Sequence, residues 1–268
     1  MNTSAWQTRF VLFLLFLSPI SSIIAFDGKI ESLETKAFSL GGLRSLENEY
    51  SNPALIPFNF SGKVGASVLN RFQMKELSTM NVFVSYPNSI IDASAKYSVY
   101  GFEDYKLNQA HIGLAKKLTS RLSLGASLIY AQESSILLDA SKNNLFADLG
   151  VYYSFNENWN FSFLVENFIH TIPKDLTHFF GGASYKGMEN VGVYGEVACR
   201  FFNEWDFSLG AEYLFLEKLS ARAGYSSLSQ NPSFGASCIL NDFEIEIGFA
   251  LHSTLGTSCI IGLSYFFT

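Results

Sequence analysis

Hydrophobic and polar residues alternate with a period of two along most of the chain after residue 60. In the stretch 243–251, Phe, Ile, Ile, Phe and Leu occupy the odd positions, while Glu, Glu, Gly and Ala occupy the even ones. Successive side chains of a β-strand point to opposite faces, so this pattern predicts a strand with one apolar face. The same alternation recurs in 121–132 and 204–216.

Fourteen such strands of about 10–13 residues are predicted. They cover 62–72, 77–87, 91–101, 108–118, 121–132, 144–155, 158–168, 176–187, 190–201, 204–216, 218–228, 232–241, 242–251 and 257–267. Strands in soluble sheets have about 5–6 residues, whereas a tilted strand that crosses a bilayer needs ~9–11. The chain is therefore predicted to be all-β, folded as a membrane-spanning antiparallel β-barrel. No stretch after Phe26 reaches 18 apolar residues, so the pattern excludes a helical membrane protein.

The predicted connections alternate in length. Those at 102–107, 133–143, 169–175 and 252–256 follow odd-numbered strands, while even-numbered strands are followed by turns of one to three residues, such as Thr119-Ser120. Membrane barrels have short periplasmic turns and longer external loops. The alternation predicts that both ends of the barrel segment lie in the periplasm.

Lipid must contact the apolar row of each strand, so the small and charged row is predicted to face the lumen. The candidate lumen residues are Arg121, Asp148, Glu196, Arg200, Glu212, Arg222, Glu244 and Glu246. Two interpretations remain open: these charges compensate one another and fill the lumen, or they form a lining that selects a solute. The three cysteines, Cys199, Cys238 and Cys259, share the apolar rows and are predicted to face lipid unpaired.

The chain before residue 62 does not follow the strand pattern. Residues 1–25 contain Arg9, an apolar run and a small residue at Ala25, as a cleaved signal peptide does. A membrane anchor is the alternative, but the run is shorter than the ~20 residues that a spanning helix needs. Residues 26–61 are predicted to form a plug or periplasmic segment, and 62–268 the barrel.

The predicted plug is rich in both turn residues and apolar residues. Gly41-Gly42 and Asn52-Pro53 are too much turn chemistry for a spanning strand. Phe38, Leu40, Leu43, Leu46 and Leu55 are too much apolar surface for a free tail. We expect the segment to fold inside the barrel or against its periplasmic mouth. Arg44 is expected to pair with a lumen carboxylate such as Glu212, Glu244 or Glu246.

The composition agrees with a membrane barrel. Hydrophobic residues make up 48% of the chain and charged residues only 16%, against roughly 25% in soluble domains. The excess apolar surface predicts outer-membrane lipid as a partner. A net charge of −6 argues against a nucleic-acid partner, because no cationic excess is available to neutralise phosphates.

Candidate catalytic chemistry is absent from the pattern. An enzyme needs a nucleophile with an acid–base group in reach, and the four histidines do not supply one. His111 and His252 fall toward the lumen or rim of distant predicted strands, and His170 and His178 flank the predicted loop 169–175. No Cys/His spacing suits zinc, and no glycine-rich phosphate loop joins a strand to a helix. The sequence predicts a protein that is not an enzyme and has no metal and no cofactor.

Two motifs resemble those of bacterial outer-membrane barrels. The alternating segment 258–267, which ends in Phe267 before one further residue, resembles their C-terminal signature. A second motif resembles the plug of FadL-like barrels, with its Asn-Pro-Ala turn. Its residues are Gly41, Gly42, Leu43, Arg44 and Ser45, followed by Tyr50, Ser51, Asn52, Pro53 and Ala54. The pattern looks most similar to the Bacteroidetes branch that contains the type IX secretion proteins PorV and PorQ.

The resemblance implies a location in the outer membrane of a Gram-negative bacterium. It also implies a non-enzymatic component of protein secretion or surface attachment, with secretion-machinery proteins as partners. The alternative is a FadL-like channel for small apolar or amphipathic solutes. The sequence does not decide between these two functions.

Overall fold

The computed structural model describes residues 28–267 except 32, 89, 137–140, 173–175, 201–203, 216–217, 228 and 230. The predicted signal peptide and its cleavage site lie outside the described residues. Among the described residues, no helix is long and apolar enough to cross a membrane.

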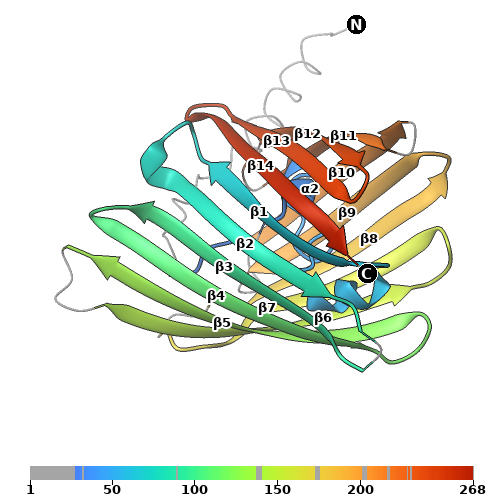
Figure 1. Ribbon diagram of the computed structural model, residues 1–268, viewed down its shortest axis with the longest axis horizontal. Coiled ribbons are helices and arrows are strands. Elements are labelled where there is room, and N and C mark those ends of the chain that lie inside the picture. The colour runs from blue at the N-terminus through green and yellow to red at the C-terminus, as the bar shows by residue number, and fades with distance from the viewer. Residues whose placement is uncertain are drawn as a thin grey trace, which may run out of the picture.

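Fourteen antiparallel strands form a closed barrel (Figure 1). They are β1 (Gly62–Asn70), β2 (Ser78–Tyr86), β3 (Asp92–Phe102), β4 (Tyr105–Lys117), β5 (Leu122–Ser135), β6 (Lys142–Ser154), β7 (Trp159–His170), β8 (His178–Met188), β9 (Val191–Arg200), β10 (Glu204–Phe215), β11 (Leu219–Ser226), β12 (Asn231–Leu240), β13 (Phe243–His252) and β14 (Gly256–Phe267). Each strand pairs with its neighbours in sequence, and β1 pairs with β14 from Gly62↔Phe267 to Asn70↔Cys259. The predicted all-β barrel and its strand number are confirmed.

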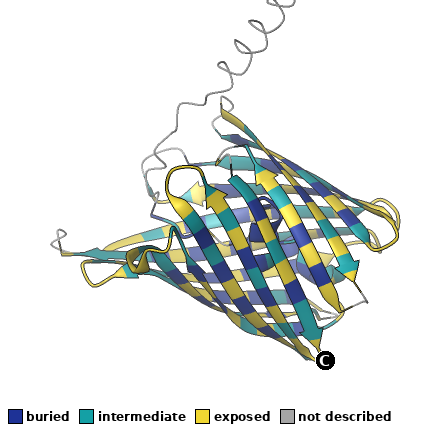
Figure 2. Cartoon of the chain, turned by 90° about the horizontal axis from the view of Figure 1, so that it is seen from above, coloured by how far each residue is buried: buried dark blue, intermediate teal, exposed yellow. Residues whose placement is uncertain are grey.

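The strands place one apolar row outside and one mostly polar row inside. On β5, the even-numbered residues Leu124, Leu128 and Tyr130 are exposed, whereas the odd-numbered Ser123 and Ser127 are buried. Figure 2 shows this alternation as bands of exposed and buried residues along each strand. Water would not cover such a surface favourably, so the barrel presents it to lipid.

Aromatic side chains gather at the end of the barrel that carries the short turns. The ring centroid of Trp159 lies 4.8 Å from that of Tyr185 and 6.3 Å from that of Phe161. Tyr86 stacks on Phe267 at 6.1 Å. Rings of this kind form girdles at the membrane–water interface of outer-membrane barrels.

Two local features differ from the sequence predictions. The predicted loop at 102–107 is wrong, because β3 and β4 stay paired to Phe102↔Tyr105 and only two residues, 103–104, connect them. Gly101 has a φ of +104°, which lets the chain bend there without breaking the ladder. Cys199 is buried, although it has the outward parity of the exposed residue Val197; Cys238 and Cys259 are half-buried, and all three are free.

The strands β6 and β7 contain a wide bulge. Their register passes from Ala147↔Ile169 to Leu149↔Val165, so Asp148 faces three residues of β7. Asn167 lies in the centre of the bulge with a φ of +54°. Its backbone N–H donates to Asp148 Oδ1 at 2.7 Å. The bulge fixes the side chains of Asp148 and Asn167 in the lumen wall.

The N-terminal segment, which we define as residues 28–61, lies inside the barrel. It contains the short helix α2 (Thr35–Ser39) and the 3₁₀-helix η1 (Pro53–Phe58); a further 3₁₀-helix, η2 (Lys75–Leu77), lies between β1 and β2. Leu40, Leu43 and Leu46 are completely buried and pack with Tyr194 of β9. These three leucines therefore lie on the inner side of the wall.

Candidate functional site

The turn at Asn52, Pro53 and Ala54 attaches the N-terminal segment to the barrel wall. Asn52 Oδ1 accepts from the amide of Ala54 at 3.2 Å, and Asn52 Nδ2 donates to the carbonyl of Ser45 at 2.9 Å. A Cβ atom on Gly125 would lie 2.5 Å from the amide nitrogen of Ala54, and one on Gly150 would overlap Asn52 Oδ1. Two inward glycines on β5 and β6 therefore make room for this turn.

Gly41 and Gly42 end α2 in the left-handed region, with φ of +90° and +75°. The amide of Gly41 donates to Ser233 Oγ at 3.0 Å, and its carbonyl accepts from Ser208 Oγ at 2.9 Å. A Cβ atom on Gly41 would lie 2.7 Å from a carbonyl oxygen of β11. Glycine is thus required both by the backbone conformation and by the close approach to the wall.

Arg44 pairs with a carboxylate that differs from those expected. Its guanidinium donates to Glu166 Oε1 from Nη2 at 2.6 Å and from Nε at 3.1 Å, and Glu31 lies 3.6 Å away. Glu196 accepts from the amides of Arg44 and Ser45 at 2.8 and 2.6 Å. These bonds hold the loop against β7 and β9, so Arg44 cannot reach Glu212, Glu244 or Glu246.

The carboxylates expected to bind Arg44 surround Arg222 instead. Arg222 donates to Glu212 at 2.8 Å and to Glu246 at 2.6 Å, with Glu244 at 3.9 Å. Lys36 of the N-terminal segment adds a 3.0 Å contact to Glu212. These charges therefore compensate one another within the lumen.

Lys36 also belongs to a second chain of ion pairs. It lies 3.0 Å from Glu47, which is in turn 2.8 Å from Lys186 of β8. Burial raises the pKa of Glu47, but the two lysines outweigh that effect and hold its pKa well below the usual range. The ionised carboxylate of Glu47 thus links the N-terminal segment to Lys186 in the wall.

The remaining candidate lumen residues fall into three environments. Asp148, Glu196, Arg222 and Glu246 are buried, while Glu212, Glu244 and Arg200 are half-buried. Arg200 ends β9, opposite His178 and Glu204. Arg121 is not in the lumen: β5 begins at Leu122, so Arg121 is exposed in the bend before it, at the rim of the barrel.

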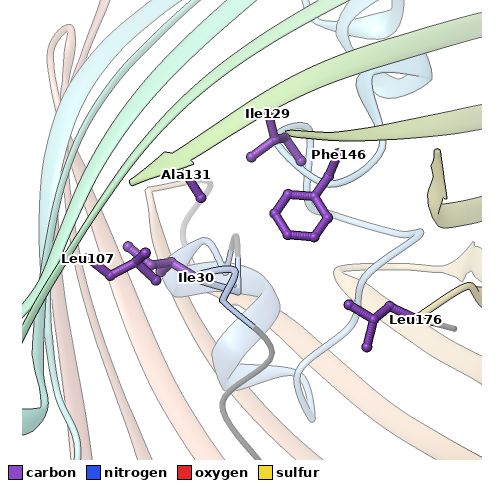
Figure 3. Packing of buried hydrophobic residues seen from close by; sticks show 6 residues of the cluster. All are labelled: Ile30, Leu107, Ile129, Ala131, Phe146 and Leu176. Atoms are coloured by element: carbon purple, nitrogen blue, oxygen red, sulfur yellow. The ribbon is translucent and has the colours of Figure 1, made fainter. Parts of the chain in front are cut away.

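An apolar cluster lies inside the end of the barrel that carries the longer loops. We call it the outer apolar cluster; its buried members are Ile30, Leu107, Ile129, Ala131, Phe146 and Leu176 (Figure 3). Tyr100, Tyr105 and Ile172 pack against it. The period-two alternation does not predict this cluster, because it implies a small and charged inner row along every strand. The available signal was the run 128–131, Leu-Ile-Tyr-Ala, where both faces of β5 become apolar.

The start of the N-terminal segment is fixed beside this cluster. The backbone of Ile30 donates to Gln109 Oε1 at 2.8 Å and accepts from Gln109 Nε2 at 3.1 Å. Lys29 Nζ lies 3.1 Å from Asp148 Oδ2 and donates to Asn167 Oδ1 at 2.8 Å. The bulge between β6 and β7 thus supplies the anchor for Lys29.

A cavity of about 10 Å³ lies deeper in the lumen, with Glu34, Lys63, Phe83 and Lys96 in its lining. That volume is close to the space that one water molecule needs. Lys63 binds Glu34 at 2.9 Å and lies 3.5 Å from Glu49. At this level the N-terminal segment leaves little free space in the barrel.

No family model and no curated protein matches this sequence. Solved structures do share its fold. The toluene transporter TodX of Pseudomonas putida superposes with a TM-score of 0.70 at 12% identity, over 89% of this chain and 98% of that chain. The barrel has a FadL-like fold. A FadL homologue of Pseudomonas aeruginosa matches with a TM-score of 0.64 at 10% identity, over 89% of this chain and 98% of that chain.

The toluene transporter TbuX of Ralstonia pickettii gives a TM-score of 0.66 at 11% identity, over 91% of this chain and all of that chain. TodX and TbuX are named as transporters, not as enzymes. The FadL-like part of the resemblance is supported at the level of the fold. The closer resemblance to PorV and PorQ stays a prediction.

Proposed function

We propose that this protein is an outer-membrane channel of a Gram-negative bacterium for small apolar or amphipathic solutes. The observation that carries the proposal is the outer apolar cluster, which lies inside a FadL-like barrel at its loop end. A barrel whose lumen is filled only for stability can use paired charges, as the surroundings of Arg222 do. An apolar lumen surface instead favours transfer of an apolar solute out of water, at about 25 cal/mol for each Å² that is buried.

The solute class is supported by the neighbours of similar fold, two of which are named as toluene transporters. In the conformation described here the N-terminal segment fills the lumen, so passage of a solute requires part of it to move. Several of its contacts to the wall are ion pairs, as at Lys29–Asp148, Arg44–Glu166 and Lys63–Glu34. Among the described residues of this segment, only Ile30 belongs to the outer apolar cluster at the loop end, so a local movement there would uncover little apolar surface of the segment itself.

The test is uptake of radiolabelled toluene by cells of a Gram-negative host that produce the full chain. Uptake should exceed that of cells without the protein. Replacing Ile129 and Phe146 by Asn should lower it about tenfold, since an apolar solute would then lie against unpaired amides. Leu128→Ala, next to Ile129 but facing lipid, is the matched control, and a heat-dependent gel shift confirms that each barrel is assembled.

The secretion or surface-attachment function, with secretion-machinery proteins as partners, has no specific feature of the site in its favour. The same cells provide its test. Equal toluene uptake with and without the protein, together with co-purification of secretion proteins from the native outer membrane, would replace the channel proposal with the secretion function.

A further inference from the structure

The inner face of β3, β4 and β5 carries buried polar side chains that lack hydrogen-bond partners among the described residues. Two adjacent rows cross these strands: Ser94↔Gly113↔Ser127, and one step nearer the loop end, Lys96↔His111↔Ile129. We call Ser94, Lys96, His111 and Ser127 the lumen polar patch. Their exposed fractions are only 4%, 5%, 2% and 5%.

Four polar atoms of this patch have no hydrogen-bond partner in the described part of the chain. They are both ring nitrogens of His111 and the hydroxyl oxygens of Ser94 and Ser127. Buried polar groups in native proteins almost always have partners, so a group of four in one place calls for an explanation. Elsewhere in the lumen, serine hydroxyls are used, as at Ser208 and Ser233, which bind the N-terminal segment.

Lys96 gives the patch a positive charge. Across the described residues its ammonium makes no ion pair within 4 Å. It lies 5.5 Å from the ring centroid of Tyr50, and Lys96 also lines the small cavity that Glu34 and Lys63 share. The carboxylates that face this region are already paired: Asp148 with Lys29, and Glu34 with Lys63. An ammonium, two hydroxyls and an imidazole offer mainly donors, which suits an acceptor such as a carboxylate.

The patch adjoins the outer apolar cluster. Ile129 is paired with His111 across the β4–β5 ladder and with Phe146 across the β5–β6 ladder, so the apolar residues begin directly beside the imidazole. Leu107 lies four residues further along β4, which is about 13 Å at ~3.3 Å for each residue. A molecule with a polar head on the patch and a compact apolar body would span both surfaces.

We propose that the lumen polar patch binds the carboxylate of a compact amphipathic acid, such as a monoaromatic carboxylate, whose ring lies in the outer apolar cluster. The proposal rests on the channel function and specifies its solute. Lys96 supplies the charge, His111 and the two serines supply hydrogen bonds, and the body of the acid takes the place of Ile30. Pro53 also covers part of the patch, since it lies 3.1 Å from the Cβ position of Gly113. Both Ile30 and Pro53 belong to the N-terminal segment, so this segment must shift while the wall need not move.

Benzoate and toluene are suitable probes, because they share a ring and differ in a carboxylate against a methyl group. Binding of each is measured by equilibrium dialysis on the purified full chain in detergent. Lys96→Met and His111→Leu should each weaken benzoate binding by about tenfold, since each removes donors from a buried carboxylate. Toluene binding should stay within about twofold of its original value, because the ring site is intact.

Lys116→Met removes an exposed lysine from the same strand, β4, and is the matched control. It should leave binding of both probes unchanged. Ile30→Ala keeps the polar patch and clears the apolar site, so it should strengthen binding of both probes. Retained toluene binding by Lys96→Met and His111→Leu guards against a loss of benzoate binding caused by poor folding.

The outcomes separate the two proposals. Selective loss of benzoate binding in Lys96→Met and His111→Leu supports the patch as a carboxylate site. Toluene binding without benzoate binding, or benzoate binding that both variants retain, overturns the patch and leaves the channel function standing. Absence of binding for both probes, together with absence of toluene uptake, overturns both.

Discussion

The lumen has two halves with different chemistry. Along β10–β14, the N-terminal segment meets the wall through close backbone contacts at Gly41 and through the charges around Arg222. Along β3–β6, it meets an apolar cluster and a patch of unpaired polar atoms. Charged residues are the obvious candidates in a sequence, yet those around Arg222 are already paired. The function is better sought where polar and apolar groups lack partners.

Removal of the segment that joins the two halves should have the largest effect. Deleting residues 37–56 takes away most of α2, the Arg44 loop and the Asn52 turn while leaving all fourteen strands. We expect the conductance of reconstituted barrels in planar bilayers to rise from almost none to that of an open pore. Assembly should be retained, as measured by the heat-dependent gel shift. If permeability stays low and recovery of partner proteins falls instead, the segment contributes to partner binding and does not close a channel.

The paired half can be tested through Arg222. Arg222→Met leaves the buried Glu246 without its cation and leaves Glu212 with Lys36 alone, which should lower the free energy of unfolding by about 3–5 kcal/mol. Arg71→Met breaks an exposed pair with Glu31 at 3.3 Å and should cost about 0–1 kcal/mol. Urea unfolding in detergent measures both. Equal effects would mean that the ion pairs around Arg222 stabilise the protein no more than an exposed ion pair does.

The close backbone contact in that half makes a smaller prediction. A Cβ atom on Gly224 would overlap the amide nitrogen of Gly41, so Gly224→Ala should destabilise the protein by about 1–3 kcal/mol. It should also make the N-terminal segment more sensitive to added protease. Gly181→Ala is the control: no atom lies within 4 Å of its Cβ position, and the change should be within about 0.5 kcal/mol.

The smallest effect is expected in the unpaired half. Lys29→Met removes the anchor to Asp148 and Asn167, and Ile30 should then leave the outer apolar cluster more often. Asp148 keeps the backbone amide of Asn167 as a donor when Lys29 is lost, so toluene uptake should rise by about fivefold at most, which corresponds to about 1 kcal/mol. Lys75→Met, at the outer loop between β1 and β2, should not change uptake. A fall in uptake with Lys29→Met would contradict a gating role for this anchor.

The period-two alternation was sufficient to predict the barrel, because side-chain direction in a strand depends only on the parity of the residue number. The same rule placed Asp148, Glu196, Arg222 and Glu246 in the lumen. It failed at the ends of strands: Arg121 lies one residue before β5, where parity no longer determines direction.

Long-range choices could not be predicted from the pattern. The carboxylate that Arg44 contacts depends on how residues 40–45 lie against β7 and β9, and that arrangement is fixed by bonds to Glu196. The outer apolar cluster escaped detection for a related reason, because inward apolar residues resemble outward ones in sequence. The lumen polar patch depends on which hydroxyls find hydrogen-bond partners in the folded chain. A pattern of strands along the sequence does not contain that information.

The N-terminal segment runs the full height of the lumen. Gly28 lies beside Asn144 at the loop end, while the ring of Phe58 lies 4.1 Å from Lys117 Nζ at the short-turn end. The wall closes through pairing of β1 with β14, the first and last of the fourteen strands along the chain. The order of assembly is therefore constrained: the segment must occupy the interior while the β1–β14 seam is still open, or be threaded through the finished ring. In the first case, closure of the wall and filling of its interior take place together.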